Sequence, residues 1–430
     1  MLVTTIFFLA TSLNVVVGLV PQATTKFIIA NNSIQSKQSF LLAESGSEDA
    51  YYRIKNNKNT TSLTIPTLNN GTVTTTIDES GATKTISTIG NVSSKERKAR
   101  LITKAGDNSA TKLDNGIHIG AGGLFIDQYA VVTGNVYSNG PVTGGSSTRY
   151  KINGDVTSAG NNGSISAYSN TTITFLKNVY AKTINKSKLN DGYKNNCNFG
   201  SNNNPACVSI DLDSIPIKPL NTVKEATISK LVDVADDVTI GSSGTTTYIK
   251  NTGVSPTSGK ITCTDGQCTL GPIKIIGNLT IDSNADVILA GPVYVTGNIT
   301  LKGSSKIRLS SFYGPKSLEA IITDGMIKTE NNFEFLTNND RYIMLLSKNT
   351  AGANKNSPYA IDFASTVTGN VILNTQKGGT RLDYSSKLKQ VTAYYLNIKN
   401  SAQLNWLSAD SLITYTFPTL GSKISSWQEE

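Results

Sequence analysis

The chain has 430 residues and a formal net charge of +9, with 16% charged and 7% aromatic residues. This length exceeds one ordinary hydrophobic core, so it predicts two or more domains or one long repeat array. Val, Ile and Leu recur in alternating runs, which excludes a disordered chain, and the frequent Asn, Thr, Ser and Gly favour β-strands with tight turns over a helical bundle.

The first predicted element is an apolar stretch, residues 2–20, that contains no charged side chain. As a helix it would rise about 28 Å, enough to cross the core of a bilayer. No basic region precedes it and its small-residue cleavage positions are weak, which favours a retained membrane anchor over a removed signal peptide. The residues expected to form the anchor are Leu2, Ile6, Phe7, Phe8, Leu9, Leu13, Val15, Val16, Val17, Leu19 and Val20.

The helical pattern continues past the apolar stretch to about residue 55. Pro21 lies where the two halves meet, and we expect it to kink the helix without ending it. The sequence therefore predicts one kinked helix of about fifty residues. Its second half is predicted to pack through one face: Phe27, Ala30, Ile34 and Leu41, with Tyr52 farther round.

The segment "AESGSEDAYYR", residues 43–53, follows the apolar run and the proline. Together these features resemble type IV pilin-type subunits, in particular PilX-like minor pilins and pilus assembly proteins. The resemblance implies a first half-helix in the membrane or filament core and a second half on a β-sheet. It also implies two partners for the helix, membrane lipid and other pilin or pilus-assembly subunits. Pilin precursors show a basic leader and an early glutamate that are not seen here, which a start codon assigned too far downstream would explain.

From about residue 56 the hydrophobic period changes from 3.6 to 2. Alternating runs separated by Asn-Asn-Gly, Asp-Glu-Ser-Gly and Gly-Asn turns predict an antiparallel meander over 56–113. The helix of residues 1–55 needs a sheet to bury its second half, and this meander is the expected partner. The sequence thus predicts a pilin-like helix-on-sheet domain.

A dense basic run lies within the meander: Lys95, Arg97, Lys98, Arg100 and Lys104. Glu96 interrupts it, and no aromatic residues interleave for base stacking. We interpret it as the solvated face of a strand and do not expect nucleic-acid binding.

Residues 114–430 contain short β-branched runs that repeat with Gly-Asn or Gly-Asp turns. Gly134 and Gly154 lie about 20 residues apart, as do Gly277 and Gly297. One such turn of chain cannot bury its own inward side chains, so this period favours stacked coils of a parallel β-solenoid; an antiparallel β-sandwich is the alternative. An insertion is expected around 180–270, with one short helix in 220–237. The stretch from Gly116 and the closing "WQEE" also resemble the β-rich ectodomain that accompanies the PilX-like helix.

The four cysteines form two close pairs in Asn-, Gly- and Pro-rich loops: Cys197 with Cys207, and Cys263 with Cys268. A zinc site would need CxxC spacings that the chain lacks, and the single histidine cannot complete one. We therefore predict two short-range disulfides in an oxidising compartment, with free thiols as the alternative.

Candidate catalytic groups are sparse. Asp211 and Asp213 share a strand face and Asp233, Asp236 and Asp237 cluster, but neither set has a nearby histidine or aromatic subsite for glycoside hydrolysis. Asp282, Asn284 and Asp286 alternate as in calcium loops, yet Val287 and Val293 occupy the EF-hand Gly and Glu positions. His118 is predicted to point away from the apolar face formed by Ile117 and Ile119. No catalytic residue, cofactor or metal is therefore expected.

The combined prediction is a non-enzymatic envelope protein: a mainly β chain behind one amino-terminal helix, single-pass in the cell membrane, with its ectodomain on the cell surface or in a pilus. A structural role as a minor pilin or pilus-assembly component is expected, with adhesion to a surface polymer or host ligand. The alternative is a secreted carbohydrate-active β-helix protein whose first twenty residues are removed. A third hypothesis is a minor pilin that binds DNA through residues 95–104.

Overall fold

The structure, a computed structural model, separates the chain into two units that are described individually: Met1–Ala105 with Ser422–Glu430, and Gly106–Gly421. The residues that it describes are 2–55, 64–68, 71–80, 83–105, 110–112, 116–146, 150–168, 173–175, 177, 179–184, 215–220, 223–236, 238–255, 261–311, 313, 317–337, 341–353, 358–375, 377–405, 414–416 and 422–429.

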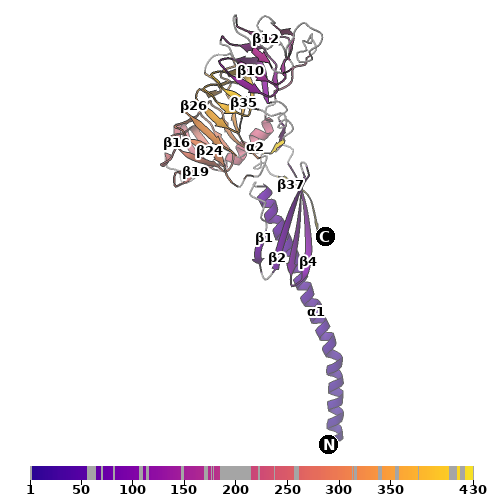
Figure 1. Ribbon diagram of the computed structural model, residues 1–430. Coiled ribbons are helices and arrows are strands. Elements are labelled where there is room, and N and C mark those ends of the chain that lie inside the picture. The colour runs from indigo at the N-terminus through magenta and orange to yellow at the C-terminus, as the bar shows by residue number, and fades with distance from the viewer. Residues whose placement is uncertain are drawn as a thin grey trace. The chain divides into compact units, whose positions relative to one another are not determined.

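The first unit combines one long helix with an antiparallel sheet (Figure 1). Helix α1 spans Leu2–Lys55, so the predicted continuous helix is confirmed. The sheet has the order β1-β2-β3-β4-β37. Its strands are β1 (Thr64–Leu68), β2 (Gly71–Ser80), β3 (Thr83–Val92), β4 (Lys95–Ala105) and β37 (Ser422–Glu429).

Local turn chemistry sets the register of this sheet. Strands β3 and β4 are joined through Ser93 and Ser94, whose φ values of 49° and 66° are those of a two-residue turn suited to the twist of a hairpin. The resulting register pairs Ile86 with Leu101 and places both side chains on the face that α1 covers. Alternation along the strands therefore gives the sheet one buried face and one exposed face.

The last strand of the first unit comes from the far end of the chain. β37 pairs antiparallel with β4, opposing Trp427 to Leu101. The sequence prediction kept this segment with residues 114–430, whereas the structure adds it to the helix-bearing sheet. The chain therefore leaves the first unit after β4 and returns to it at β37.

The second unit is built mainly from short parallel strands in two large sheets. One sheet has the order β13-β10-β7-β35-β33-β30-β27-β24-β21-β19-β18. Its strands are β7 (Val131–Thr133), β10 (Tyr150–Asn153), β13 (Ile173–Phe175), β18 (Thr262–Thr264), β19 (Gln267–Leu270), β21 (Asp286–Leu289), β24 (Lys306–Leu309), β27 (Phe333–Leu336), β30 (Val367–Gly369), β33 (Lys387–Leu388) and β35 (Gln403–Asn405).

The other large sheet follows the order β11-β12-β14-β15-β16-β17-β20-β22-β23-β25-β26-β28-β29-β31-β32-β34-β6-β8-β9. Its strands are β6 (Ile117–Ile126), β8 (Val136–Ser138), β9 (Val142–Gly144), β11 (Val156–Ser158), β12 (Ser164–Ala167), β14 (Val179–Ala181), β15 (Thr183–Ile184), β16 (Thr239–Lys250), β17 (Gly253–Ser255), β20 (Ile273–Ile281), β22 (Val293–Val295), β23 (Ile299–Lys302), β25 (Leu318–Thr323), β26 (Ile327–Glu330), β28 (Tyr342–Ser347), β29 (Ile361–Phe363), β31 (Val371–Thr375), β32 (Gly379–Leu382) and β34 (Gln390–Ile398). A further antiparallel pair joins β5 (Ala110–Lys112) to β36 (Thr414–Thr416).

The repeated Gly-Asn turns lie directly above one another. A Cβ added to Gly154 would lie only 1.9 Å from the carbonyl oxygen of Gly134, so these positions require glycine for close stacking. The neighbouring asparagines link the turns: Asn278 Oδ1 accepts a hydrogen bond of 2.8 Å from the backbone N–H of Asn298. Each predicted repeat therefore supplies both the space and the donor-acceptor pair that hold the next turn of chain.

The stack of turns begins in the middle of the unit. From β6 the strands advance through β8, β11 and β14, and the chain later re-enters at β16 and returns through β20, β25 and β31 to β34. β34 then pairs in parallel with β6, opposing Val391 to Ile117. The first and last turns of this unit are thus neighbours, and one apolar core runs through both series.

Helix α2 (Glu225–Asp236) lies within the chain segment that joins the two series, where the sequence predicts a short helix. Its apolar side packs on the outer surface of the second large sheet: Ile228 and Leu231 belong to one buried cluster with Tyr294, Ile322 and Met344 (Figure 1). The predicted mainly β chain with one long amino-terminal helix is confirmed. Among the described pairings of this unit the antiparallel ones are β5–β36, β16–β17 and β18–β19, so the sandwich alternative finds no support.

Candidate functional site

The first half of α1 makes no buried contact within the described structure. Every described side chain from Leu2 to Ile34 is exposed, and residues such as Leu2 and Phe8 expose 76% and 77% of their surface. A window of this helix reaches a mean hydropathy of 2.1 with none of it buried, which makes it long and apolar enough to cross a membrane. All eleven side chains predicted to form the anchor lie in this exposed half.

Polar side chains in the exposed half bond back to the helix itself. Thr11 Oγ1 donates to the carbonyl oxygen of Phe7 at 2.9 Å, and Thr25 Oγ1 donates to that of Pro21 at 2.7 Å. Hydroxyl groups satisfied in this way need no water, so they are compatible with an apolar surrounding. Pro21 lies inside the helix, and its role as a kink stays a prediction.

The second half of α1 is docked on the sheet through small side chains. At its start the described residues Ser36 and Gln35 become half-buried, and from residue 39 a continuous stripe is buried. The spacing of three and four residues is that of one helical face. The stripe consists of Ser39, Leu42, Ala43, Gly46, Ser47 and Ala50.

The packing face predicted from the large apolar residues is wrong. Phe27, Ile34 and Leu41 expose 73%, 56% and 60% of their surface, and Ala30 is exposed as well. Tyr52 likewise exposes 52% of its surface. The docked face was missed because its residues are small, and hydrophobic periodicity gives small residues little weight.

Two glycines allow the helix and sheet backbones to approach closely. A Cβ on Gly90 of β3 would lie 2.1 Å from the carbonyl oxygen of Ser39. A Cβ on Gly46 of α1 would lie 2.5 Å from Cγ1 of Val73 on β2. Side chains larger than hydrogen therefore cannot be accommodated at either position without moving the helix from the sheet.

The "AESGSEDAYYR" segment supplies the contacts along this interface. Ser47 Oγ donates a buried hydrogen bond of 3.0 Å to Thr88 Oγ1 on β3. One turn later, Ala50 is fully buried in a cluster with Ile86 and Leu101. The small residues of the segment thus face the sheet at helical spacing.

The charged residues of the same segment lie off the interface. Arg53 Nε donates to Asp49 Oδ2 at 2.7 Å, an i,i+4 ion pair along the helix. Both side chains are about one-third exposed, so the pair supports the helix only modestly. This segment is therefore explained by packing and helix stability.

An aromatic contact closes the edge of the interface. The ring of Phe40 on α1 lies edge-to-face against Trp427 on β37, with 5.8 Å between centroids. Nothing in the sequence pattern joined these two residues, because almost the whole chain separates them.

The basic run on β4 does not form one strip. Ala99 and Leu101 face the helix, so Lys98 and Arg100 lie on the opposite face of the sheet. Arg97 lies on the helix side, where its Nε donates to Ser36 Oγ at 2.7 Å. Alternation thus divides the positive charge between two faces.

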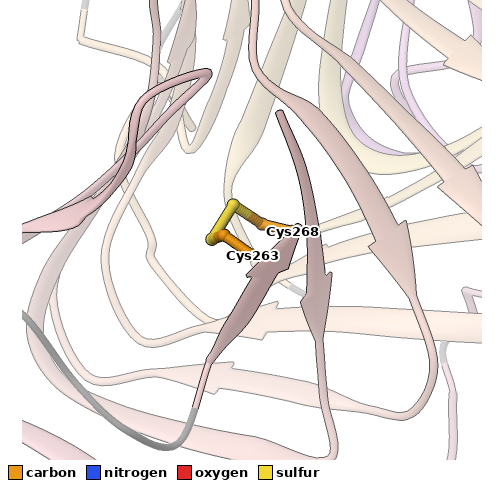
Figure 2. Close-up of a disulfide and its surroundings, with 2 residues drawn as sticks. All are labelled: Cys263 and Cys268. Carbon is orange, nitrogen blue, oxygen red and sulfur yellow. A yellow bond between two sulfur atoms is a disulfide. The ribbon is translucent and has the colours of Figure 1, made fainter. Parts of the chain in front are cut away.

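One of the two predicted cysteine pairs lies in the described residues. Cys263 and Cys268 oppose each other across the β18–β19 hairpin, with a sulfur–sulfur distance of 2.07 Å and a Cα–Cα distance of 4.0 Å (Figure 2). Cys268 is fully buried in the core, and β18 is the terminal strand of its sheet. The disulfide closes the hairpin at that end; Cys197 and Cys207 lie outside the described residues.

Three of the described candidate carboxylates have structural partners, whereas Asp233 is exposed on α2. Asp236, at the end of α2, lies 2.9 Å from Lys274 Nζ, and this hydrogen-bonded ammonium lowers the pKa of Asp236. Asp286 is held by Arg308 and Gln267, and Asp282 Oδ1 accepts from the backbone N–H of Ser283 at 2.6 Å. Asp211, Asp213 and Asp237 lie outside the described residues.

The calcium-like alternation and the histidine show no metal geometry. The φ of Asn284 is 56°, as expected for a turn between strands. His118 is buried, and its ring packs edge-to-face on Tyr137 at 5.5 Å between centroids, on the opposite side of β6 from the core residues Ile117 and Ile119. Within the part of the chain that the structure describes, no three His, Cys, Asp or Glu residues are placed to hold a metal ion.

Comparisons with known proteins give a structural likeness and no sequence match. No protein-family model matches the sequence, and no curated protein sequence matches it. A solved structure that resembles the chain is the competence-associated pilin ComZ from Thermus thermophilus, with a TM-score of 0.27, 12% sequence identity, and coverage of 92% of this chain and 97% of that one. A TM-score this low supports no inference about fold or function, so the proposed function depends on the helix and sheet described above.

Proposed function

We propose that the protein is a pilin-like subunit of the cell envelope, held by the first half of α1 and exposing its β-rich remainder outside the cytoplasm. The observation that carries this proposal is the contrast within one helix. An apolar window is wholly exposed, while the next turns are docked on a sheet through small residues. Exposed apolar surface of this extent calls for lipid or for the corresponding helices of other subunits.

Within that proposal the second unit is a parallel β-solenoid that serves as the presented body. Support comes from strand pairs about 20 residues apart, such as Val136 with Val156 and Leu279 with Ile299. The role is structural, that of a minor pilin or a pilus-assembly component, with adhesion as the use of the solenoid surface. No catalytic role is proposed.

The chain path supports a role in which the second unit is under mechanical tension. The second unit is connected to the first by two chain segments, one after β4 and one before β37. β5 and β36, the described strands of the second unit nearest in sequence to these two connections, pair antiparallel with Lys112 opposite Thr414. A body held by two connections distributes a pulling force over both, as suits a subunit exposed on a surface.

Protease accessibility tests this function. Trypsin added to intact cells is expected to cleave at Lys26 or Lys37, beyond the anchor, and to leave residues 2–25 in the membrane fraction. Cleavage at these lysines only after cell disruption would contradict the proposed orientation. A mature protein lacking the first two dozen residues and released into the medium would instead favour the secreted alternative.

A further inference from the structure

A cavity of about 760 Å³ lies on the outer surface of the second unit. Four neighbouring parallel strands form its floor, where the register aligns Thr269, Ile288, Arg308 and Leu336. Adjacent strands lie about 4.8 Å apart, so this floor is an elongated surface running along the stack. Its volume falls within the usual range of small-molecule sites.

The floor combines apolar surface with hydroxyl groups. Ile288 is half-buried and Leu336 exposes 37% of its surface, although both lie among polar strand residues. Hydroxyl groups of Thr269, Ser311 and Thr337 line the same cavity. Such a lining suits a ligand with one apolar face and many hydroxyl groups, as a sugar ring has.

The charge of the cavity favours an anion. Arg308 and Arg341 line it together with one carboxylate, Glu334. Asp286, which shares the outer face of β21 with Ile288, fixes the Arg308 guanidinium by a two-point hydrogen bond that uses two of its five N–H groups. Lys306 Nζ lies 3.7 Å from the same carboxylate. With Asp286 and Lys306 included, three cations lie beside two carboxylates. Arg341 is the guanidinium of the lining that Asp286 does not bind, and its fork suits a planar anion.

We propose that this cavity binds an acidic oligosaccharide, with a sugar carboxylate on Arg341 and the ring face on Ile288 and Leu336. The elongated floor favours a chain of sugars over a single ring. The inference deepens the adhesive role by naming a site and a ligand class, but it does not rest on membrane anchoring, since binding is measured on detergent-purified full-length protein.

The test uses a short oligogalacturonate and its methyl ester, which have the same rings but differ in charge. Titration calorimetry of the intact protein should show saturable binding of the acid and at least tenfold weaker binding of the ester. Arg341→Gln should weaken binding of the acid at least tenfold and remove the difference in affinity between the acid and the ester. Leu336→Gln should weaken binding of the acid and of the ester by the same factor. Lys328→Gln, which removes an exposed cation on β26, is the matched control and should change neither.

Three results would overturn the proposal: no saturable binding of the acid at millimolar concentration, equal affinity for acid and ester, or an unchanged acid–ester difference in Arg341→Gln. A circular dichroism melting curve equal to that of the parent protein establishes that each variant is folded. If an acidic peptide binds the cavity and the oligogalacturonate does not, the carbohydrate assignment is likewise wrong.

Discussion

The two halves of α1 show opposite relations between side-chain size and burial. In the first half, large apolar residues such as Phe8 and Leu13 are exposed, and in the second half the buried residues include Ala43, Gly46 and Ser47. The first half needs apolar surroundings that the rest of the described chain does not supply. The second half needs close backbone approach, which large side chains would prevent. A single helix thus meets two different surroundings through two different kinds of residue.

Because the two halves of α1 depend on different properties, mutations can test the apolar character of the first half and the close packing of the second half separately. Substitutions in the exposed half should alter only where the protein resides. Substitutions at the docked stripe should alter only how the first unit folds. Changes in the second unit should leave both halves of the helix as they are.

The largest expected effect is on membrane retention. Leu13→Lys with Val16→Lys places two charges in the exposed half at side chains that expose 62% and 53% of their surface. Each lysine near the centre of a span costs about 3 kcal/mol, so the pair should move most of the protein out of the membrane fraction. Sedimentation of cell fractions measures this, and Ile34→Lys, outside the apolar run, is the control that should remain in the membrane.

The next effect is on the docked half. Gly90→Val would force a side chain against the Ser39 carbonyl oxygen and should destabilise the first unit by about 3 kcal/mol. Hydrogen exchange of residues 39–55 should accelerate, while membrane retention is unchanged. Thr74→Val, on the exposed face of the same sheet, should leave exchange as in the parent protein. Equal exchange in both variants would show that close approach is not what holds the helix.

A pH-dependent effect is expected in the second unit. Burial raises the pKa of Glu319 from its usual 4.5 to about 7, although Tyr313 donates a 2.6 Å hydrogen bond to the carboxylate. Because the folded state holds this proton more tightly, the stabilisation is full below pH 4.5 and is lost as the pH rises to about 7, a difference of about 3 kcal/mol.

Glu319→Gln removes this titration. Denaturant unfolding at pH 5 and pH 8 should therefore show a smaller loss of stability in the variant than in the parent protein, with hydrogen exchange of residues 39–55 unaffected. An identical pH dependence in both proteins would mean that Glu319 keeps an ordinary pKa in the folded chain.

The smallest effect is that of the Cys263–Cys268 disulfide. It closes a short hairpin loop, so the chain-entropy model gives it about 2 kcal/mol. Reducing agent should lower the stability of the second unit by this amount and leave the first unit unchanged. Cys263→Ala with Cys268→Ala should no longer respond at this hairpin, and a parent protein insensitive to reductant would contradict the assignment.

Sequence patterns predicted the elements of this chain better than their contacts. The helix over residues 2–55 follows from apolar composition and 3.6-residue periodicity, and the stacked glycines follow from the 20-residue repeat between positions such as Gly134 and Gly154. Both are local or periodic signals, which a single sequence carries in full.

Contacts between residues distant in the chain leave no local or periodic signal in a single sequence. The docked stripe was not predicted from the sequence because Gly46 and Ser47 have little hydrophobicity. The pairing of β37 with β4 was not predicted because it has no local sequence signature. The floor of the cavity, with Arg308 beside Ile288 and Leu336, depends on the register of strands whose spacing in sequence varies. Its components appear in the sequence only as ordinary alternating strand residues.

The central claim is that the first half of α1 is retained and lies in apolar surroundings. Intact-mass measurement of the protein from the membrane fraction tests this most directly. The account predicts a mass that includes residues 2–25, recovered only with detergent. Recovery of a chain that starts after residue 23, soluble without detergent, would contradict it.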